Sequence, residues 1–115
     1  MSSPRALVFL SIFLPAVLAP LEISAAELRI LDSLGLTRAV KSVEKAAKVI
    51  ITASIEEDKS QPADLYLSHV DGLAPDIEGT RNPDKSLLFV EVPEGVWKIT
   101  APDQHIIISE VKIVQ

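Results

Sequence analysis

Cysteine is absent from the 115-residue sequence. Disulfide scaffolds, thiolate catalysis, iron–sulfur ligation and cysteine-based zinc sites all require that residue, so each of these classes is excluded. The sequence also lacks any run of Lys and Arg, and 11 basic residues stand against 16 acidic ones for a net charge of −5. Proteins that bind nucleic acids use clustered basic side chains to displace counterions from phosphates, so this charge balance argues against nucleic acid as a partner.

Catalytic signatures are missing as well. No Gly-x-Ser-x-Gly elbow supports a nucleophilic serine. The sequence has two histidines, His69 and His105, whereas a catalytic zinc ion normally takes three protein ligands. We interpret both histidines as structural or surface residues, and we expect neither enzymatic activity nor a cofactor.

The longest apolar run, residues 6–19, follows the first basic residue, Arg5. It is shorter than the roughly 20 residues that an α-helix needs to cross the hydrocarbon core of a bilayer, so it predicts a secretory signal peptide. Ser24 and Ala26 place small side chains at the two positions that a signal peptidase must accept, which predicts cleavage after Ala26 and a signal peptide over residues 1–26. The alternative is an uncleaved anchor; after cleavage we expect no membrane span.

The predicted mature chain keeps a net charge of −5, because the signal peptide contains one cation and one anion. A domain of this size buries only about 60–65% of its unfolded surface, and small secreted eukaryotic domains usually compensate with disulfides. The sequence has no cysteine and no N-glycosylation sequon, since Asn82 is followed by Pro83. These absences favour a bacterial protein that is periplasmic or secreted.

Residues 27–47 are predicted to form a lead-in and one short amphipathic helix. The apolar residues of 28–36 fit either a short strand or the start of a helix, with an interruption at Gly35. Thr37 is a candidate N-cap for a helix over 37–47. Apolar side chains then recur at helical spacing at Ala39, Val40, Val43, Ala46 and Ala47. The opposite face carries Arg38, Lys41, Lys45 and Lys48; we interpret it as a solvated face, with an anionic lipid surface or acidic partner as the alternative.

A period of two replaces the helical spacing in residues 48–115. Strands are predicted at 49–55, 64–70, 87–92, 96–101 and 106–114. Short strands that recur at intervals of about ten residues indicate a small antiparallel β-sandwich, so the fold class is mainly β with one helix ahead of the sandwich. Three consecutive isoleucines in the last strand break its alternation, which predicts a bulge or a change of buried face near Ser109.

The segment Leu88–Ile99 reads LFVEVPEGVWKI. It resembles the hairpin of prealbumin-like sandwiches, the Cna-B and carboxypeptidase-regulatory-like modules, in which a Phe strand, a Pro-x-Gly turn and an aromatic strand follow one another. In such a hairpin Pro93 ends the first strand, Gly95 allows the tight return, and Phe89 and Trp97 pack between the sheets. The resemblance implies a mostly non-catalytic module that serves as a stalk, spacer or binding surface.

Residues 73–86 are rich in proline, glycine and acidic side chains and predict an exposed loop. This loop is the best candidate for specificity, and the side chains predicted to contact a partner are Asp76, Glu78, Arg81 and Asp84. Calcium prefers six to eight oxygen ligands, so weaker candidates for a metal site are Asp71, Asp76, Glu78 and Asp84, although the spacing of an EF-hand is missing.

These observations predict an exported, non-enzymatic interaction module, a periplasmic accessory protein that contacts a protein partner of the cell envelope through the acidic loop 73–86. The alternative from another class is a carrier domain for a small ligand or Ca²⁺. A small hydrolase is a third hypothesis, and it requires a pocket around His69 or His105.

Overall fold

The computed structural model describes residues 26–102 and 104–115. The predicted signal peptide, residues 1–26, lies outside these ranges except for Ala26. Among the described residues there is no helix that could cross a membrane.

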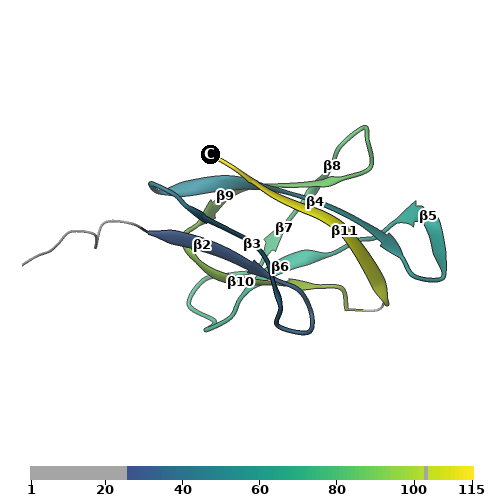
Figure 1. The fold of residues 1–115 in the computed structure, drawn as a ribbon, viewed down its shortest axis with the longest axis horizontal. Helices are drawn as coiled ribbons and strands as arrows, with labels where there is room; N and C mark the ends of the chain where they lie inside the picture. Colours follow the sequence, from purple (N-terminus) through teal and green to yellow (C-terminus); the bar gives the residue numbers. More distant parts are fainter. Residues whose placement is uncertain (1–25, 103) are drawn as a thin grey trace, which may run out of the picture.

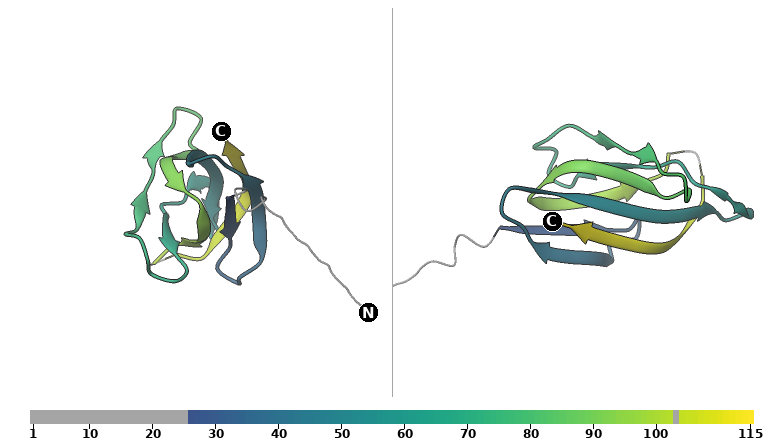
Figure 2. Two further views of the ribbon diagram at one scale, coloured as in Figure 1. Left: turned by 90° about the vertical axis from the view of Figure 1, so that its left-hand side faces the viewer. Right: turned by 90° about the horizontal axis from the view of Figure 1, so that it is seen from above.

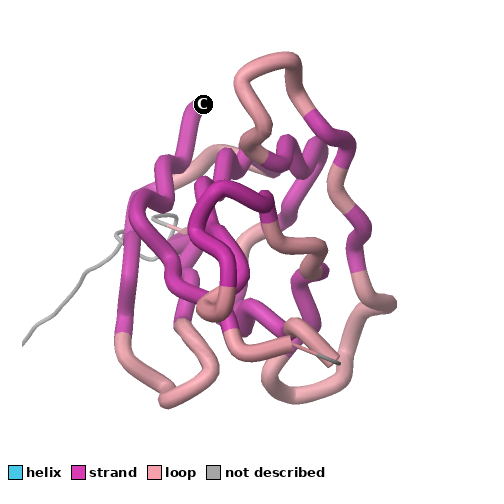
Figure 3. The backbone as a smooth tube through the Cα atoms, turned by 90° about the vertical axis from the view of Figure 1, so that its right-hand side faces the viewer, coloured by secondary structure: helices cyan, strands magenta, loops and turns pink. Residues whose placement is uncertain are grey.

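Ten strands in the described residues form two packed sheets of five strands each (Figure 1). The first sheet has the order β3 (Thr37–Ser42), β2 (Glu27–Leu31), β10 (Gly95–Thr100), β6 (Tyr66–His69) and β7 (Ile77–Glu78). The second sheet has the order β11 (Ile106–Val114), β4 (Ala46–Ile55), β9 (Leu87–Pro93) and β8 (Thr80–Arg81), with β5 (Asp58–Pro62) paired to the end of β4. Viewed along the long axis, the strands surround one shared interior (Figure 3).

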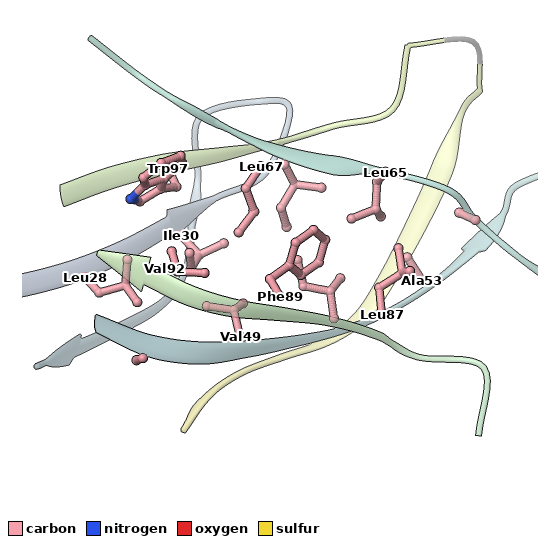
Figure 4. Close-up of a cluster of buried hydrophobic side chains, with 14 of the residues drawn as sticks. Leu28, Ile30, Val49, Ala53, Leu65, Leu67, Leu87, Phe89, Val92 and Trp97 are labelled. Carbon is pink, nitrogen blue, oxygen red and sulfur yellow. The ribbon is translucent and has the colours of Figure 1, made fainter. Parts of the chain in front are cut away.

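The core lies between the two sheets, where alternate side chains of each strand meet (Figure 4). Phe89 from β9 and Trp97 from β10 are both 0% exposed, and the smaller side chains of β2, β4 and β6 fill the space around them. The prediction that Phe89 and Trp97 pack between the sheets is confirmed. The predicted strands of residues 48–115 are confirmed as elements, because a period of two places every second side chain in the core.

The predicted helix over 37–47 is wrong, because β3 and the start of β4 occupy this range and the described residues contain no helix. Ala39, Val43 and Ala47 face the core, as the pattern predicted, and each is four residues from the next. A spacing of four is about one helical turn and also two repeats of a strand, so the same pattern fits both elements. Pairing of β3 with β2, in which Ala39 lies opposite Ile30, decides in favour of the strand.

The sandwich is not wholly antiparallel. β2 pairs with β10 in parallel, from Leu28 opposite Gly95 to Leu31 opposite Lys98. The chain therefore begins its described part with a strand that lies inside the first sheet, between β3 and β10. Residues 27–47 contribute two strands to this sheet.

The predicted hairpin over 88–99 is also wrong, since β9 belongs to the second sheet and β10 to the first. The Pro93–Gly95 turn crosses from one sheet to the other instead of returning along the same sheet. Trp97 holds this crossing from inside, because its indole Nε1–H donates to the carbonyl oxygen of Pro93 at 3.0 Å. Both aromatic side chains can face the same interior because their strands lie on opposite sides of it.

The predicted irregularity near Ser109 is confirmed by a shift in the β11–β4 register between Ile108 and Glu110. Two side chains fix the bulge: the Ser109 hydroxyl donates to the carbonyl of Thr52 at 3.1 Å, and the Arg38 guanidinium donates to the carbonyl of Ile108 at 3.1 Å. The second contact joins β3 of the first sheet to β11 of the second and so closes one side of the sandwich.

Candidate functional site

The prediction that residues 73–86 form one exposed loop is only partly correct. This segment carries two short strands, β7 and β8, that close the other side of the sandwich. Glu78 of β7 lies opposite Tyr66 in the first sheet, and Thr80 of β8 lies opposite Leu88 in the second. The chain crosses between the sheets at Gly79, where an added Cβ would lie 2.9 Å from Cζ of Phe89. Glycine is therefore required at the crossing because the backbone runs against the core.

A pocket of about 400 Å³ opens beside this crossing. Its lining consists of Asp64, Leu65, Tyr66, Glu78, Gly79, Leu87, Pro102 and Gln104. Two carboxylates, one phenol and one amide supply its polar groups, while none of its lining residues is Lys, Arg or His. We call this the acid-lined pocket.

Gln104 lines the acid-lined pocket. Its Oε1 atom is buried and has no hydrogen-bond partner among the described residues, so it is shielded from solvent. With two carboxylates and no basic side chain in its lining, the pocket favours a ligand that carries positive charge.

Arg81, a predicted partner-binding residue, forms hydrogen bonds within the protein. Its guanidinium donates to the carboxylate of Asp64 at 2.7 Å and to the carbonyls of Ala63 at 2.9 Å and Lys85 at 2.7 Å. These bonds tie β8 and the turn that follows it to the segment before β6. The Asp64 side chain remains 90% exposed, so a carboxylate at the rim of the pocket already accepts one guanidinium and is open to solvent.

Asp84 has a local role as well. Its Oδ1 accepts hydrogen bonds from the Ser86 hydroxyl at 2.6 Å and the Ser86 amide at 3.0 Å, and these bonds lower the pKa of the Asp84 carboxyl. They stabilise the turn between β8 and β9, which two backbone bonds between Asn82 and residues 85–86 also close. Of the four predicted contact residues, Asp76 and Glu78 are exposed and enter no ion pair among the described residues, and only Glu78 lines the pocket.

The candidate calcium ligands are not brought together. No group of three or more His, Asp or Glu side chains that could hold a metal ion occurs in the described residues. Asp71 follows the end of β6 at His69, whereas Glu78 lies opposite Tyr66 at the start of that strand. Asp84 lies in the separate turn between β8 and β9.

The two histidines also lie in different surroundings. The His69 ring packs edge-on against Trp97 with ring centroids 5.1 Å apart, and its Nδ1 accepts the backbone N–H of Asp71 at 3.1 Å. The His105 side chain is 89% exposed and lies 3.8 Å from the carboxylate of Glu56. Neither histidine lines the acid-lined pocket.

Sequence reasoning missed three residues of the pocket, Asp64, Tyr66 and Gln104. Alternation in residues 64–70 separates Tyr66 from the core-facing Leu65 and Leu67, which was a signal for its half-exposed position. No sequence signal pointed to Gln104, because its place depends on how the chain passes from β10 to β11.

Comparisons with known proteins add no family to this description, since no family model, no curated protein and no solved structure matches the chain. The described part of the chain, residues 26–102 and 104–115, is all-β and consists of two packed sheets.

Proposed function

We propose that this protein is an exported, non-enzymatic binding module whose acid-lined pocket holds a cationic side chain of a protein partner in the cell envelope. The observation that carries the proposal is the pocket itself, which has a volume of about 400 Å³, two carboxylates and no basic residue in its lining.

A Lys or Arg side chain fits this chemistry. Lys brings three N–H donors and Arg brings five, and neither brings an acceptor. Hydrogen bonds between a cation and a carboxylate are roughly twice as strong as neutral ones. Glu78, which enters no ion pair among the described residues, supplies the main attraction, whereas Asp64 already pairs with Arg81. Tyr66 also lines the pocket, and an aromatic ring beside a cation at an exposed site contributes about 0.5–1 kcal/mol.

The surroundings of the pocket support a macromolecular partner. Asp76, two residues before the pocket residue Glu78, is exposed and adds a further acidic side chain to the segment that leads into β7. The net charge of −5 attracts a basic partner over a longer range and raises its association rate.

Export and the non-catalytic character rest on the sequence. The apolar run before residue 26 supports secretion, and the missing Gly-x-Ser-x-Gly elbow supports a non-catalytic role. The cell-envelope partner and the bacterial periplasm remain parts of this proposal.

The test is the affinity of the protein for a fluorescent peptide of four arginines and four glycines, measured by anisotropy at low and at physiological salt. We expect Glu78→Gln to weaken binding at least about fivefold, since it removes the negative charge of an acid that lines the pocket. Glu94→Gln is the matched control, because Glu94 is also an exposed acid but lies away from the pocket. Glu94 comes just before the start of β10, and the pocket residue Tyr66 lies opposite Thr100 at the other end of that strand.

Equal loss of affinity in Glu78→Gln and Glu94→Gln means that net charge alone attracts the peptide, and it overturns the proposal. If a free diamine such as putrescine binds as tightly as the peptide, the pocket belongs to a small-ligand carrier instead.

A further inference from the structure

A second pocket, of about 180 Å³, lies on the second sheet. Strands β4, β9 and β11 run side by side there, and the hairpin of β4 and β5 extends beyond them at one end (Figure 2, right). Four segments of this sheet meet at the pocket, and its lining includes Thr52 and Ser54 of β4, Lys59 and Gln61 of β5, Lys85 of the turn between β8 and β9, and Ser109 of β11. It shares no residue with the acid-lined pocket. We call it the basic pocket.

The charge of the basic pocket is opposite to that of the acid-lined pocket. Lys59 and Lys85 line it, and none of its lining residues is Asp or Glu. Neither lysine forms an ion pair within the described part of the chain. The fold therefore brings two positive charges from separate segments to one small cavity, where a bound anion would relieve their mutual repulsion.

Uncharged hydrogen-bond donors complete the lining. Thr52 and Ser54 alternate with the core-facing residues of β4, so their hydroxyls point to the outer face of the sheet. These two hydroxyls and the side-chain amide of Gln61 donate to no atom of the described residues. The Ser109 hydroxyl is already used, because it donates to the carbonyl of Thr52 at the bulge. Two cations and three neutral donors thus remain for a ligand.

The backbone at Lys85 supports a role for its side chain. Its φ of 75° lies in the left-handed region that favours glycine. Other residues in that region cost free energy, and they cluster at ligand-binding sites. The Lys85 amide donates to the carbonyl of Asn82 at 2.9 Å, and its carbonyl accepts the Arg81 guanidinium at 2.7 Å. The lysine side chain is therefore carried on an anchored backbone.

Three carboxylates are chain neighbours of lining residues without lining the pocket themselves: Asp58, Asp84 and Glu110. Asp58 accepts hydrogen bonds from the hydroxyl and the amide of Ser60, which satisfy part of its charge. Glu110 lies opposite Thr52 in the register of β11 and β4, so it shares the outer face with the pocket. Its repulsion and the net charge of −5 limit the affinity for an anion.

We propose that the basic pocket binds the phosphate group of a small ligand. A phosphate monoester carries a charge of about −1.5 to −2 at pH 7 and three strong acceptor oxygens. These oxygens match the ammonium groups of Lys59 and Lys85 together with the hydroxyl and amide donors. The volume of about 180 Å³ is below the roughly 300–1,000 Å³ of pockets for drug-sized ligands, so the phosphate group itself is the part that the pocket encloses.

Amide chemical shifts of the purified protein, expressed from its full-length gene and labelled with ¹⁵N, test this inference. Inorganic phosphate is titrated at pH 7 with sodium chloride adjusted to constant ionic strength. We expect saturable shifts centred on residues 52–54, 59–61 and 85, with a dissociation constant of about 1–10 mM. Glycerol 3-phosphate is the second probe. Tighter binding than inorganic phosphate identifies a phosphate monoester as the ligand, and equal or weaker binding identifies the free ion.

Four variants separate the pocket from general charge effects. Lys59→Gln and Lys85→Gly should each raise the dissociation constant at least about fivefold, because each removes a charged donor. Loss of binding in Lys85→Gly does not come from unfolding, since the left-handed turn favours glycine. Glu110→Gln should lower the dissociation constant by about twofold or more, because it removes a repulsive charge. Lys98→Gln is the control and should change it by less than about twofold, because Lys98 is exposed on β10 of the other sheet.

The absence of saturable shifts up to about 50 mM phosphate overturns the inference. So does an equal loss of affinity in Lys59→Gln and Lys98→Gln, because net charge alone then attracts the anion. Shifts that are largest at residues outside the basic pocket also overturn it, since the anion then binds at another place.

Discussion

The turn between β8 and β9 holds Lys85 in a left-handed backbone conformation, with a φ of 75°. The same turn geometry occurs between β2 and β3, where Gly35 takes the corresponding place with a φ of 84°. In each turn the first residue donates its amide to the carbonyl of the fifth, and the fourth donates to the carbonyl of the first: Asn82, Lys85 and Ser86 in one, Asp32, Gly35 and Leu36 in the other. The protein thus has glycine in one of two equivalent positions and lysine in the other.

This comparison predicts that Lys85→Gly stabilises the protein. A left-handed conformation costs a residue with a Cβ about 1–2 kcal/mol, while glycine adds about 0.4–1 kcal/mol of backbone entropy to the unfolded chain. The net gain is about 0.5–1 kcal/mol, which raises the melting temperature of a domain of this size by roughly 3–6 °C. Gly35→Lys should have the opposite effect of similar size, because a Cβ at Gly35 meets no atom within 4 Å and only the backbone conformation opposes it.

Urea denaturation at pH 7 measures both changes in the free energy of unfolding. Lys85→Ala is the control, since it removes the lysine charge but keeps a Cβ in the left-handed conformation. The reasoning is refuted if Lys85→Gly is no more stable than Lys85→Ala, or if Gly35→Lys leaves the free energy of unfolding unchanged.

Three further predictions concern other parts of the fold. Gly79→Ala should destabilise the protein by about 1–3 kcal/mol in urea denaturation, because the new methyl group meets the Phe89 ring at 2.9 Å; a neutral result would mean that the ring moves aside freely. Trp97→Phe should lower the free energy of unfolding by about 1–3 kcal/mol, since it leaves the Pro93 carbonyl without its donor and a space in the core, and retained parental stability would contradict this. Asp84→Asn should destabilise the protein at pH 7 but not at low pH, because hydrogen bonds from Ser86 lower the folded-state pKa of the Asp84 carboxyl. The stability that this carboxylate contributes is therefore present above the unfolded-state pKa near 3.8. It is lost as the pH falls through the lower folded-state pKa. A difference between parent and Asp84→Asn that persists below pH 2 would speak against this assignment.

The strands of residues 48–115 follow from local patterning. β-branched residues and a period of two identify β4, and the break in alternation identifies the bulge at Ser109, because both are properties of the strand itself. The N-terminal range 37–47 lacks such a distinction. Its apolar spacing of four fits a helix and a strand equally, and pairing with β2 decides between them.

The candidate site was predictable only in part. Glu78 lines the pocket as an exposed acid of the segment predicted for partner contact. Arg81 and Asp84 belong to the same segment, yet their hydrogen bonds hold the turn between β8 and β9, which composition does not reveal. Gln104 enters the pocket only because the chain passes from one sheet to the other between β10 and β11.

The sequence by itself determined the excluded chemistries, the charge, the β class and the positions of most strands, because each depends on residue type or on neighbours along the chain. The tertiary structure alone decided the parallel pairing of β2 with β10, the assignment of β9 and β10 to different sheets, and the requirement for glycine at residue 79. These features depend on contacts between segments far apart in the sequence. Such contacts are selected by the packing of the whole core around Phe89 and Trp97, which no local pattern encodes.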